Sequence, residues 1–185
     1  MINFTFNTKI LFRTIVVYLI LTFVWTALCI NYDEFADNDK GLYSGLGYLI
    51  LFGISIGQNF DHLGKLLFFT ILSIFTFLIS SFAIGPLVGF TINSMILYAI
   101  INSGFVAAVM VYTVDKLMEI QFKKVTFILT FTLLLLAYFL ISNTQDYLYM
   151  DYDLHPRISM FIIFQFALIT SLSIGLSIKE HTLPK

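Results

Sequence analysis

Residues 41–58 read GLYSGLGYLILFGISIGQ, an apolar stretch that is interrupted by five glycines. A helix rises about 1.5 Å per residue and the hydrocarbon core of a bilayer is about 30 Å thick, so roughly 17 to 25 apolar residues cross it. Glycine is unfavourable inside an isolated helix, because it loses the most conformational freedom on folding. The stretch is therefore either a membrane helix that packs tightly on a neighbour or a broken element that lines a path through the membrane.

The composition of the whole chain is that of an integral membrane protein. Its 185 residues are 59% hydrophobic and 11% charged, and the mean hydropathy is +0.92. Soluble domains carry about 25% charged residues. No polar block is long enough to fold a separate core, so we expect a single transmembrane domain over residues 1–185. The net charge of -1 argues against a nucleic-acid partner.

Six apolar segments are long enough to cross a bilayer. They cover residues 10–32, 42–58, 66–84, 89–114, 125–142 and 158–178. Because these runs are continuously apolar and do not alternate with period two, we expect helices and not outer-membrane strands. The sequence thus predicts an all-α bundle of about six transmembrane helices with short loops. The first segment is expected to remain uncleaved, since it is longer than the apolar core of a signal peptide.

The charged residues predict the orientation of this bundle. One side of the predicted topology holds eight of the ten basic residues, which are Lys9, Arg13, Lys65, Lys116, Lys123, Lys124, Lys179 and Lys185. Since positive residues stay in the cytoplasm, both termini are expected to be cytoplasmic, in a bacterial inner membrane. The alternation supports an even number of spans. The GPLVG turn at residues 85–89 carries no charge, and it is either an external loop or a buried kink.

The central parts of the predicted spans contain no acid, no base and no set of metal ligands. Ionisable groups inside a membrane are costly and mark function, so their absence argues against a proton-coupled pump and against zinc or aspartyl intramembrane proteases. Cys29 is the only cysteine, which excludes an intramolecular disulfide and a CxxC redox pair. We therefore expect no catalytic residue, no metal and no cofactor.

Two loops on the predicted outer side resemble binding sites without completing the pattern. DEFADNDKG, residues 33–41, lacks the later ligands of a calcium loop, and YLYMDYDLHPR, residues 147–157, alternates tyrosines with acids. A solvated acidic loop explains the first stretch, and an interfacial aromatic belt explains the second. Calcium binding and a dedicated binding patch are the alternatives.

Neutral polar side chains are the remaining candidates within the membrane. Asn93 and Asn102 lie in the fourth predicted span, and Gln165 lies in the sixth. At 100° per residue, their separation places the two asparagines on opposite faces of one helix. Each is therefore expected to bond to a different neighbouring helix. A solute site built from Asn102 and Gln165 is the alternative.

Two surfaces of small residues predict close helix packing. The first is the ridge of Gly41, Gly45, Gly53 and Gly57, and the second, in the fourth span, consists of Ala99, Ser103, Gly104, Ala107 and Ala108. Such spacing lets helix backbones approach closely. We interpret residues 41–58 as a packed helix whose partner is the fourth span or a helix of another chain. The fourth span is predicted to be the central packing helix.

The loop between the second and third spans, NFDHLGK, places three charged or titratable residues together: Asp61, His62 and Lys65. A hydrogen-bonded loop or helix cap is the simple explanation. A gating contact or a docking contact for a partner is the functional one.

Three classes of function fit the sequence, in which no family motif is evident. The first is a non-catalytic membrane subunit or accessory protein that docks to a protein partner or to a second copy. The second is a small transporter, channel or solute-binding subunit. In size and topology alone, the chain resembles the substrate-binding components of energy-coupling-factor transporters. The third is a lipid-modifying enzyme, which would depend on loop residues such as Asp61 and His62. We favour the first class.

Overall fold

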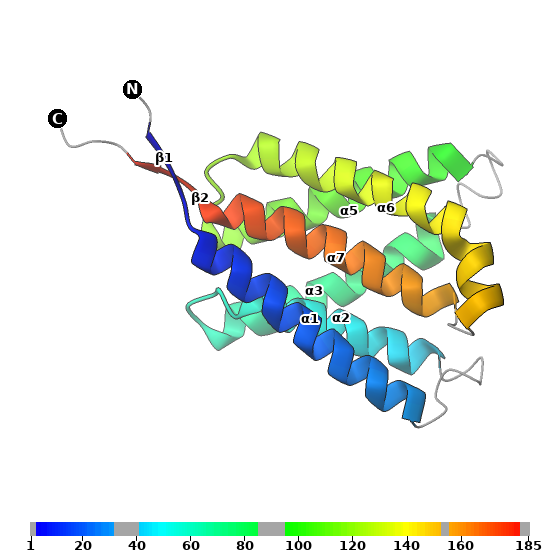
Figure 1. Ribbon diagram of the computed structural model, residues 1–185. Coiled ribbons are helices and arrows are strands. Elements are labelled where there is room, and N and C mark those ends of the chain that lie inside the picture. Colours follow the sequence, from blue (N-terminus) through cyan, green and yellow to red (C-terminus); the bar gives the residue numbers. More distant parts are fainter. Residues whose placement is uncertain (1–2, 32–40, 85–94, 153–155, 182–185) are drawn as a thin grey trace.

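The computed structural model describes residues 3–31, 41–84, 95–152 and 156–181. Within these ranges the helices form a bundle, and they are α1 (Thr8–Asn31), α2 (Gly41–Gly57), α3 (Leu63–Ile79), α5 (Met95–Met118), α6 (Lys123–Tyr152) and α7 (Pro156–Ser177) (Figure 1). A short π-helix, η1 (Ser80–Ile84), continues α3, and two short strands, β1 (Asn3–Phe6) and β2 (Ile178–His181), flank the helices. The predicted helical bundle is confirmed.

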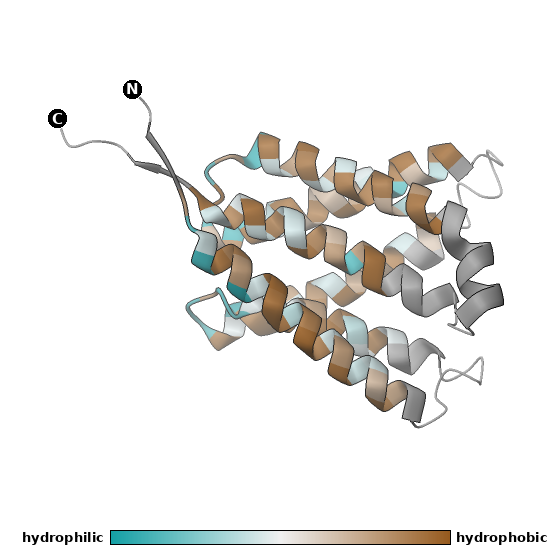
Figure 2. Cartoon of the chain, in the orientation of Figure 1, coloured by the Kyte–Doolittle hydropathy of each residue, from teal (hydrophilic) through white to brown (hydrophobic). Residues whose placement is uncertain are grey.

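Three helical segments in the described ranges are long and apolar enough to cross a membrane. They are Thr8–Cys29, Ile96–Met118 and Lys123–Ile141, and shorter apolar helices cover Gly45–Gly57, Leu63–Ile79 and Ile162–Ser177. Many large apolar side chains are exposed on the bundle, and those of Phe12 and Phe23 are more than 70% exposed. Hydrophobic residues occur along the length of the helices (Figure 2). Soluble monomers rarely expose so large an apolar surface. These helices indicate a protein embedded in a membrane.

The helices differ from the predicted spans in several places, and three of these differences matter here. α5 ends at Met118 and not at residue 114, so Asp115 belongs to the helix. α6 continues to Tyr152 and not to residue 142, because residues 142–152 contain no proline or glycine to stop it. The third predicted span changes from α-helix to π-helix at Ser80. The GPLVG turn at residues 85–89 lies outside the described residues.

α7 is the central helix, and the prediction that the fourth span has this place is wrong. α7 packs against α1, α2, α5 and α6. Its residues 165–177 are buried on nearly every face, with Phe166 the clear exception. Small and hydroxyl-bearing side chains such as Ser171 and Ser173 let α7 fit among four neighbours. α5, the predicted centre, packs mainly on α3, η1 and α6, and leaves Ile96 and Tyr112 exposed.

The glycine-rich stretch forms one continuous helix, α2, which lies against α3. A β-carbon added at Gly53 would lie 2.8 Å from Cβ of Thr70, and one added at Gly57 would lie 2.7 Å from Cγ of Leu66. Both distances are far shorter than van der Waals contact. The partner of these two glycines is therefore the next helix of the same chain, and not the fourth span or another chain.

Two further glycines make contacts of the same kind. A β-carbon at Gly47 would overlap the Trp25 ring of α1, and one at Gly175 of α7 would overlap Thr126 of α6. Neither glycine belongs to the predicted ridge. Close helix approach in this bundle thus depends on three glycines of α2, of which Gly53 and Gly57 belong to the predicted ridge, and on Gly175 of α7.

Both termini lie at the same end of the bundle (Figure 1). β1 pairs antiparallel with β2, so that Asn3 lies opposite His181 and Phe6 opposite Ile178. The start of α1, the α2–α3 loop and the α5–α6 turn gather at this end, where hydrophilic residues are concentrated (Figure 2). We call it the basic end, after its described lysines and arginine, which are Lys9, Arg13, Lys65, Lys116, Lys123, Lys124 and Lys179.

Candidate functional site

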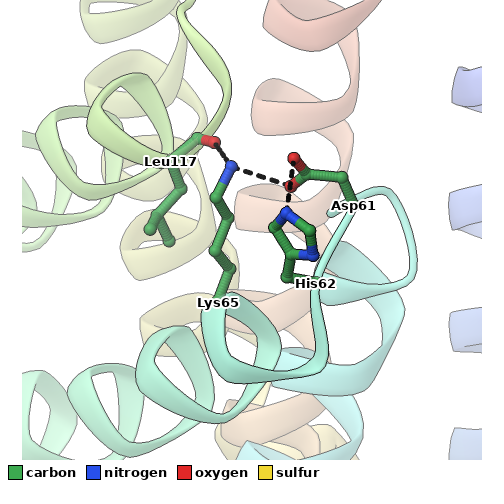
Figure 3. Close-up of polar contacts among 4 residues, drawn as sticks. All are labelled: Asp61, His62, Lys65 and Leu117. Carbon is green, nitrogen blue, oxygen red and sulfur yellow. Dashed lines mark hydrogen bonds and ion pairs between the residues drawn. The ribbon is translucent and has the colours of Figure 1, made fainter.

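The α2–α3 loop is held in place by Lys65. Its Nζ lies 2.7 Å from Oδ1 of Asp61 and donates a hydrogen bond of 3.1 Å to the carbonyl oxygen of Leu117 in α5 (Figure 3). The hydrogen bond from Lys65 is the main reason why the pKa of the Asp61 carboxyl lies below its ordinary value. One cation thus fixes the loop and also satisfies a carbonyl group at the end of α5, which has no partner within its helix.

The other two members of the predicted cluster are exposed. His62 Nε2 lies 3.6 Å from Oδ2 of Asp61, and the side chains of His62 and Asp61 are 75% and 61% exposed. His62 is the N-cap residue of α3, but its side chain makes no capping hydrogen bond. The structure therefore brings Asp61, His62 and Lys65 together, and ties them to α5.

Asp115 is a buried acid that the sequence analysis did not single out. Its Oδ2 lies 2.7 Å from Nζ of Lys123, and its Oδ1 accepts a hydrogen bond of 3.1 Å from the N–H of Ile120. Glu119 has a left-handed backbone, with φ at 57°, and this reverses the chain between α5 and α6. A carboxylate in the last turn of a helix opposes the helix dipole, and the pairing with Lys123 offsets this. The signal in the sequence for this ion pair was an acid in the last turn of one helix, followed by a lysine at the start of the next.

Arg13 makes a third connection at the basic end. Its Nη2 donates a hydrogen bond of 2.5 Å to Oδ1 of Asn59, which follows α2. Nδ2 of Asn59 in turn donates to Oγ1 of Thr14 at 2.9 Å. Polar ties thus join α1 to the end of α2, the α2–α3 loop to α5, and α5 to the start of α6.

Asn102 is the centre of a polar cluster in the interior of the bundle. Its Oδ1 accepts a hydrogen bond of 2.5 Å from Ser80, and its Nδ2 donates to the hydroxyls of Tyr138 and Tyr98. The two tyrosine rings meet edge to face, with their centroids 5.7 Å apart. Each polar atom of the Asn102 amide therefore has a partner. The amide ties η1, α5 and α6 together.

Gln165 belongs to a different interior cluster. The hydroxyl of Tyr18 in α1 lies 3.3 Å from Oε1 of Gln165 and 3.3 Å from the carbonyl oxygen of Ile162. Gln165 is fully buried, and its Nε2 has no hydrogen-bond partner among the described residues. No described hydrogen bond joins Gln165 to Asn102, so the two amides bond to different neighbours.

The remaining predicted residues have varied places. In α5, Ala99, Ser103 and Ala107 are buried, Ala108 is exposed, and a β-carbon at Gly104 would be in ordinary contact with Phe131. Gly45 is buried in α2. Asn93, the surroundings of Gly41, and the side chains of the two outer stretches, residues 33–41 and 147–157, lie outside the described part.

Nothing outside the chain itself identifies these sites. Comparison with protein-family models, with curated proteins and with solved structures finds no match. The described side chains include no group of three His, Cys, Asp or Glu residues that could hold a metal ion. Any proposal about function therefore rests on the basic end and on the two interior amide clusters.

Proposed function

We propose that this chain is a non-catalytic membrane protein that docks to a protein partner through its basic end. The observation that carries the proposal is the arrangement around Lys65, which holds the α2–α3 loop against α5 while Asp61 and His62 remain exposed. A loop that is already fixed loses little conformational freedom when a partner binds. A rigid and charged surface of this kind is suited to protein recognition.

The charge around the loop indicates the chemistry of the partner. Lys116, Lys123 and Lys124 are exposed at the α5–α6 turn, and Lys9 is exposed at the start of α1. A partner with an acidic surface complements them, and such complementarity increases association rates and selects against wrong partners. The positive-inside rule favours a cytoplasmic location for the basic end and for both termini.

Co-purification after gentle detergent extraction tests the docking proposal. The tagged wild-type chain should retain a partner in fixed stoichiometry, and the double variant His62→Ala/Lys124→Glu should release it. Phe75→Leu, which changes an exposed apolar side chain of α3, is the matched control and should retain the partner. A wild-type chain that purifies only as a functional monomer would contradict the proposal.

A small transporter, channel or solute-binding subunit is the second candidate. It is favoured by the buried amide of Gln165, because a polar atom without a partner inside a membrane protein marks a place for a ligand or for water. Uptake of a solute that fails in Gln165→Leu while the chain still folds would support this candidate. We do not propose a lipid-modifying enzyme, because Asp61 is already engaged by Lys65.

A further inference from the structure

One face of α1 carries a polar side chain at every fourth position: Thr14, Tyr18, Thr22 and Thr26. Residues four apart lie on the same face of a helix. The first three are almost completely buried, and α1 packs against α2 and α7. At about 1.5 Å per residue the stripe extends for about 18 Å, which is more than half of the hydrocarbon thickness. A largely buried line of hydroxyl groups thus runs along the junction of α1 with α2 and α7.

The two ends of this stripe are bonded to α2 and to the residues that follow it. Thr14 Oγ1 accepts a hydrogen bond of 2.9 Å from Nδ2 of Asn59, and Thr26 Oγ1 lies 2.7 Å from the hydroxyl of Tyr48. Both are ordinary ties between neighbouring helices. They need no further partner to explain them.

The middle of the stripe is different, because two polar atoms there are left over. Oγ1 of Thr22 and Nε2 of Gln165 are both buried, and neither makes a hydrogen bond of normal geometry among the described residues, although the Tyr18 hydroxyl lies close to Oγ1 of Thr22. Tyr18 connects the two, since it bonds to Gln165 and lies one turn from Thr22 on the same face of α1. Turning the Gln165 amide over would exchange its two ends, and one polar atom would still lack a partner.

Buried polar atoms of this kind normally have a hydrogen-bond partner in native proteins. Buried polar groups nearly always have a partner, which is protein or ordered water, and the membrane interior offers no bulk water to replace it. The surrounding segments, residues 14–31, 41–59 and 162–177, contain no charged residue. The environment therefore suits a neutral molecule and opposes an ion.

We propose that Tyr18, Thr22 and Gln165 form a binding site for a small uncharged hydrogen-bonding solute, of which water is the smallest. The amide of Gln165 donates to the solute through Nε2, and the hydroxyl of Thr22 both donates and accepts. This inference rests on the second proposed function, for which it names the place and the class of solute. Asn102 takes no part, since its amide is already fully bonded.

Thermal unfolding in detergent tests whether the site is filled. Thr22→Val keeps the size of the side chain and removes Oγ1. If a solute or water bonds to that atom, the Tm should fall by about 2 to 4 °C. If the site is dry, the change removes an unpartnered polar group, so the Tm stays the same or rises, and the proposal is overturned. Gln165→Leu should also lower the Tm, but it removes the bond to Tyr18 as well, so Thr22→Val is the deciding variant.

Thr113→Val is the matched control for these variants. Thr113 is a buried residue of α5 whose hydroxyl donates to the carbonyl oxygen of Val109 at 2.7 Å. The Tm of this variant shows how much stability is lost when one hydroxyl that is hydrogen-bonded within its own helix is removed. If the Tm of Thr22→Val falls by at least as much as that of this control, Thr22 has lost a hydrogen bond that was present in the wild type.

Flux measurements separate this site from the transport function on which it rests. Proteoliposomes with the wild-type chain should shrink faster in an osmotic step, or take up glycerol faster, than empty vesicles, and sodium should not enter. Thr22→Val and Gln165→Leu should abolish that gain, whereas Thr113→Val should keep it. A Tm loss without any wild-type flux supports the site and overturns transport. Wild-type flux that survives in both site variants overturns the site and leaves transport standing.

Discussion

The interior of the bundle and its basic end are both held by polar contacts, but the contacts differ in kind. In the interior they are neutral and buried, as in the cluster around Asn102. At the basic end they are ionic and partly exposed, as in the pair of Lys65 with Asp61. Exposed pairs contribute about 0 to 1 kcal/mol each and are screened over about 8 Å at physiological salt. We infer that interior contacts hold the fold, whereas the contacts at the basic end fix the shape of the surface that a partner would meet.

The largest effect is expected where the interior is most tightly packed. Gly53→Leu should destabilise the fold by about 3 kcal/mol or prevent folding, because even a β-carbon at this position collides with Thr70. Denaturant titration of the purified chain in micelles would measure the change. Gly64→Leu is the control, since a β-carbon there meets nothing within 4 Å. Equal stability of the two variants would contradict the close packing of α2 on α3.

Asn102→Leu should have the next largest effect, about 2 kcal/mol. It leaves the hydroxyls of Ser80 and Tyr138 without their amide partner inside the bundle. The loss should be the same at low and at high salt, because no group in this cluster is charged. Unfolding free energies measured at two salt concentrations check this. A loss that shrinks at high salt would break the distinction between the interior and the basic end.

Asp115→Asn tests a contact that lies between the two kinds. The side chain of Asp115 is 8% exposed, but that of its partner Lys123 is 62% exposed. The change removes the charge and retains an oxygen that can accept from Ile120, so the expected loss is about 1 kcal/mol and is partly screened by salt. Glu119→Gln, at an exposed acid in the same turn, is the control and should be near neutral. A loss as large as that of Asn102→Leu would show that buried ionic contacts also hold the fold.

The existence of the helices was predictable from the sequence, but which helix lies at the centre of the bundle was not. Apolar runs of sufficient length identify helices because the bilayer requires them. Lipid and protein core are equally apolar, so hydropathy does not distinguish a helix at the centre from one at the edge. The signal for α7 was its content of small and hydroxyl residues, such as Ser171, Ser173 and Gly175. Such residues let a helix fit among several neighbours.

The candidate sites also include features that were predictable from the sequence and features that were not. Asp61, His62 and Lys65 were predictable as a cluster because they lie within five consecutive residues. The bond from Lys65 to Leu117 and the pairing of Tyr18 with Gln165 join distant parts of the chain, and no local pattern indicates them. The spacing of four between Thr14, Tyr18 and Thr22 was visible in the sequence. The spacing alone does not say which helices this face of α1 contacts; the structure shows that α1 packs on α2 and α7.

The smallest effect is expected at Asp61, and its pH dependence would sharpen the comparison most directly. The pKa of the Asp61 carboxyl is lowered in the folded chain, chiefly by the hydrogen bond from Lys65. A lowered pKa stabilises the fold above the ordinary aspartate value of about 3.9, and this contribution is lost as the pH falls through the lowered value. The stability difference between the wild type and Asp61→Asn should therefore be constant from about pH 7 to pH 5 and should vanish only in stronger acid. The difference between the wild type and Asn102→Leu should remain unchanged over the same range, because no carboxylate or imidazole belongs to that cluster. If both differences vary together with pH, the two regions unfold as one electrostatic unit, and the division between a neutral interior and a charged basic end fails.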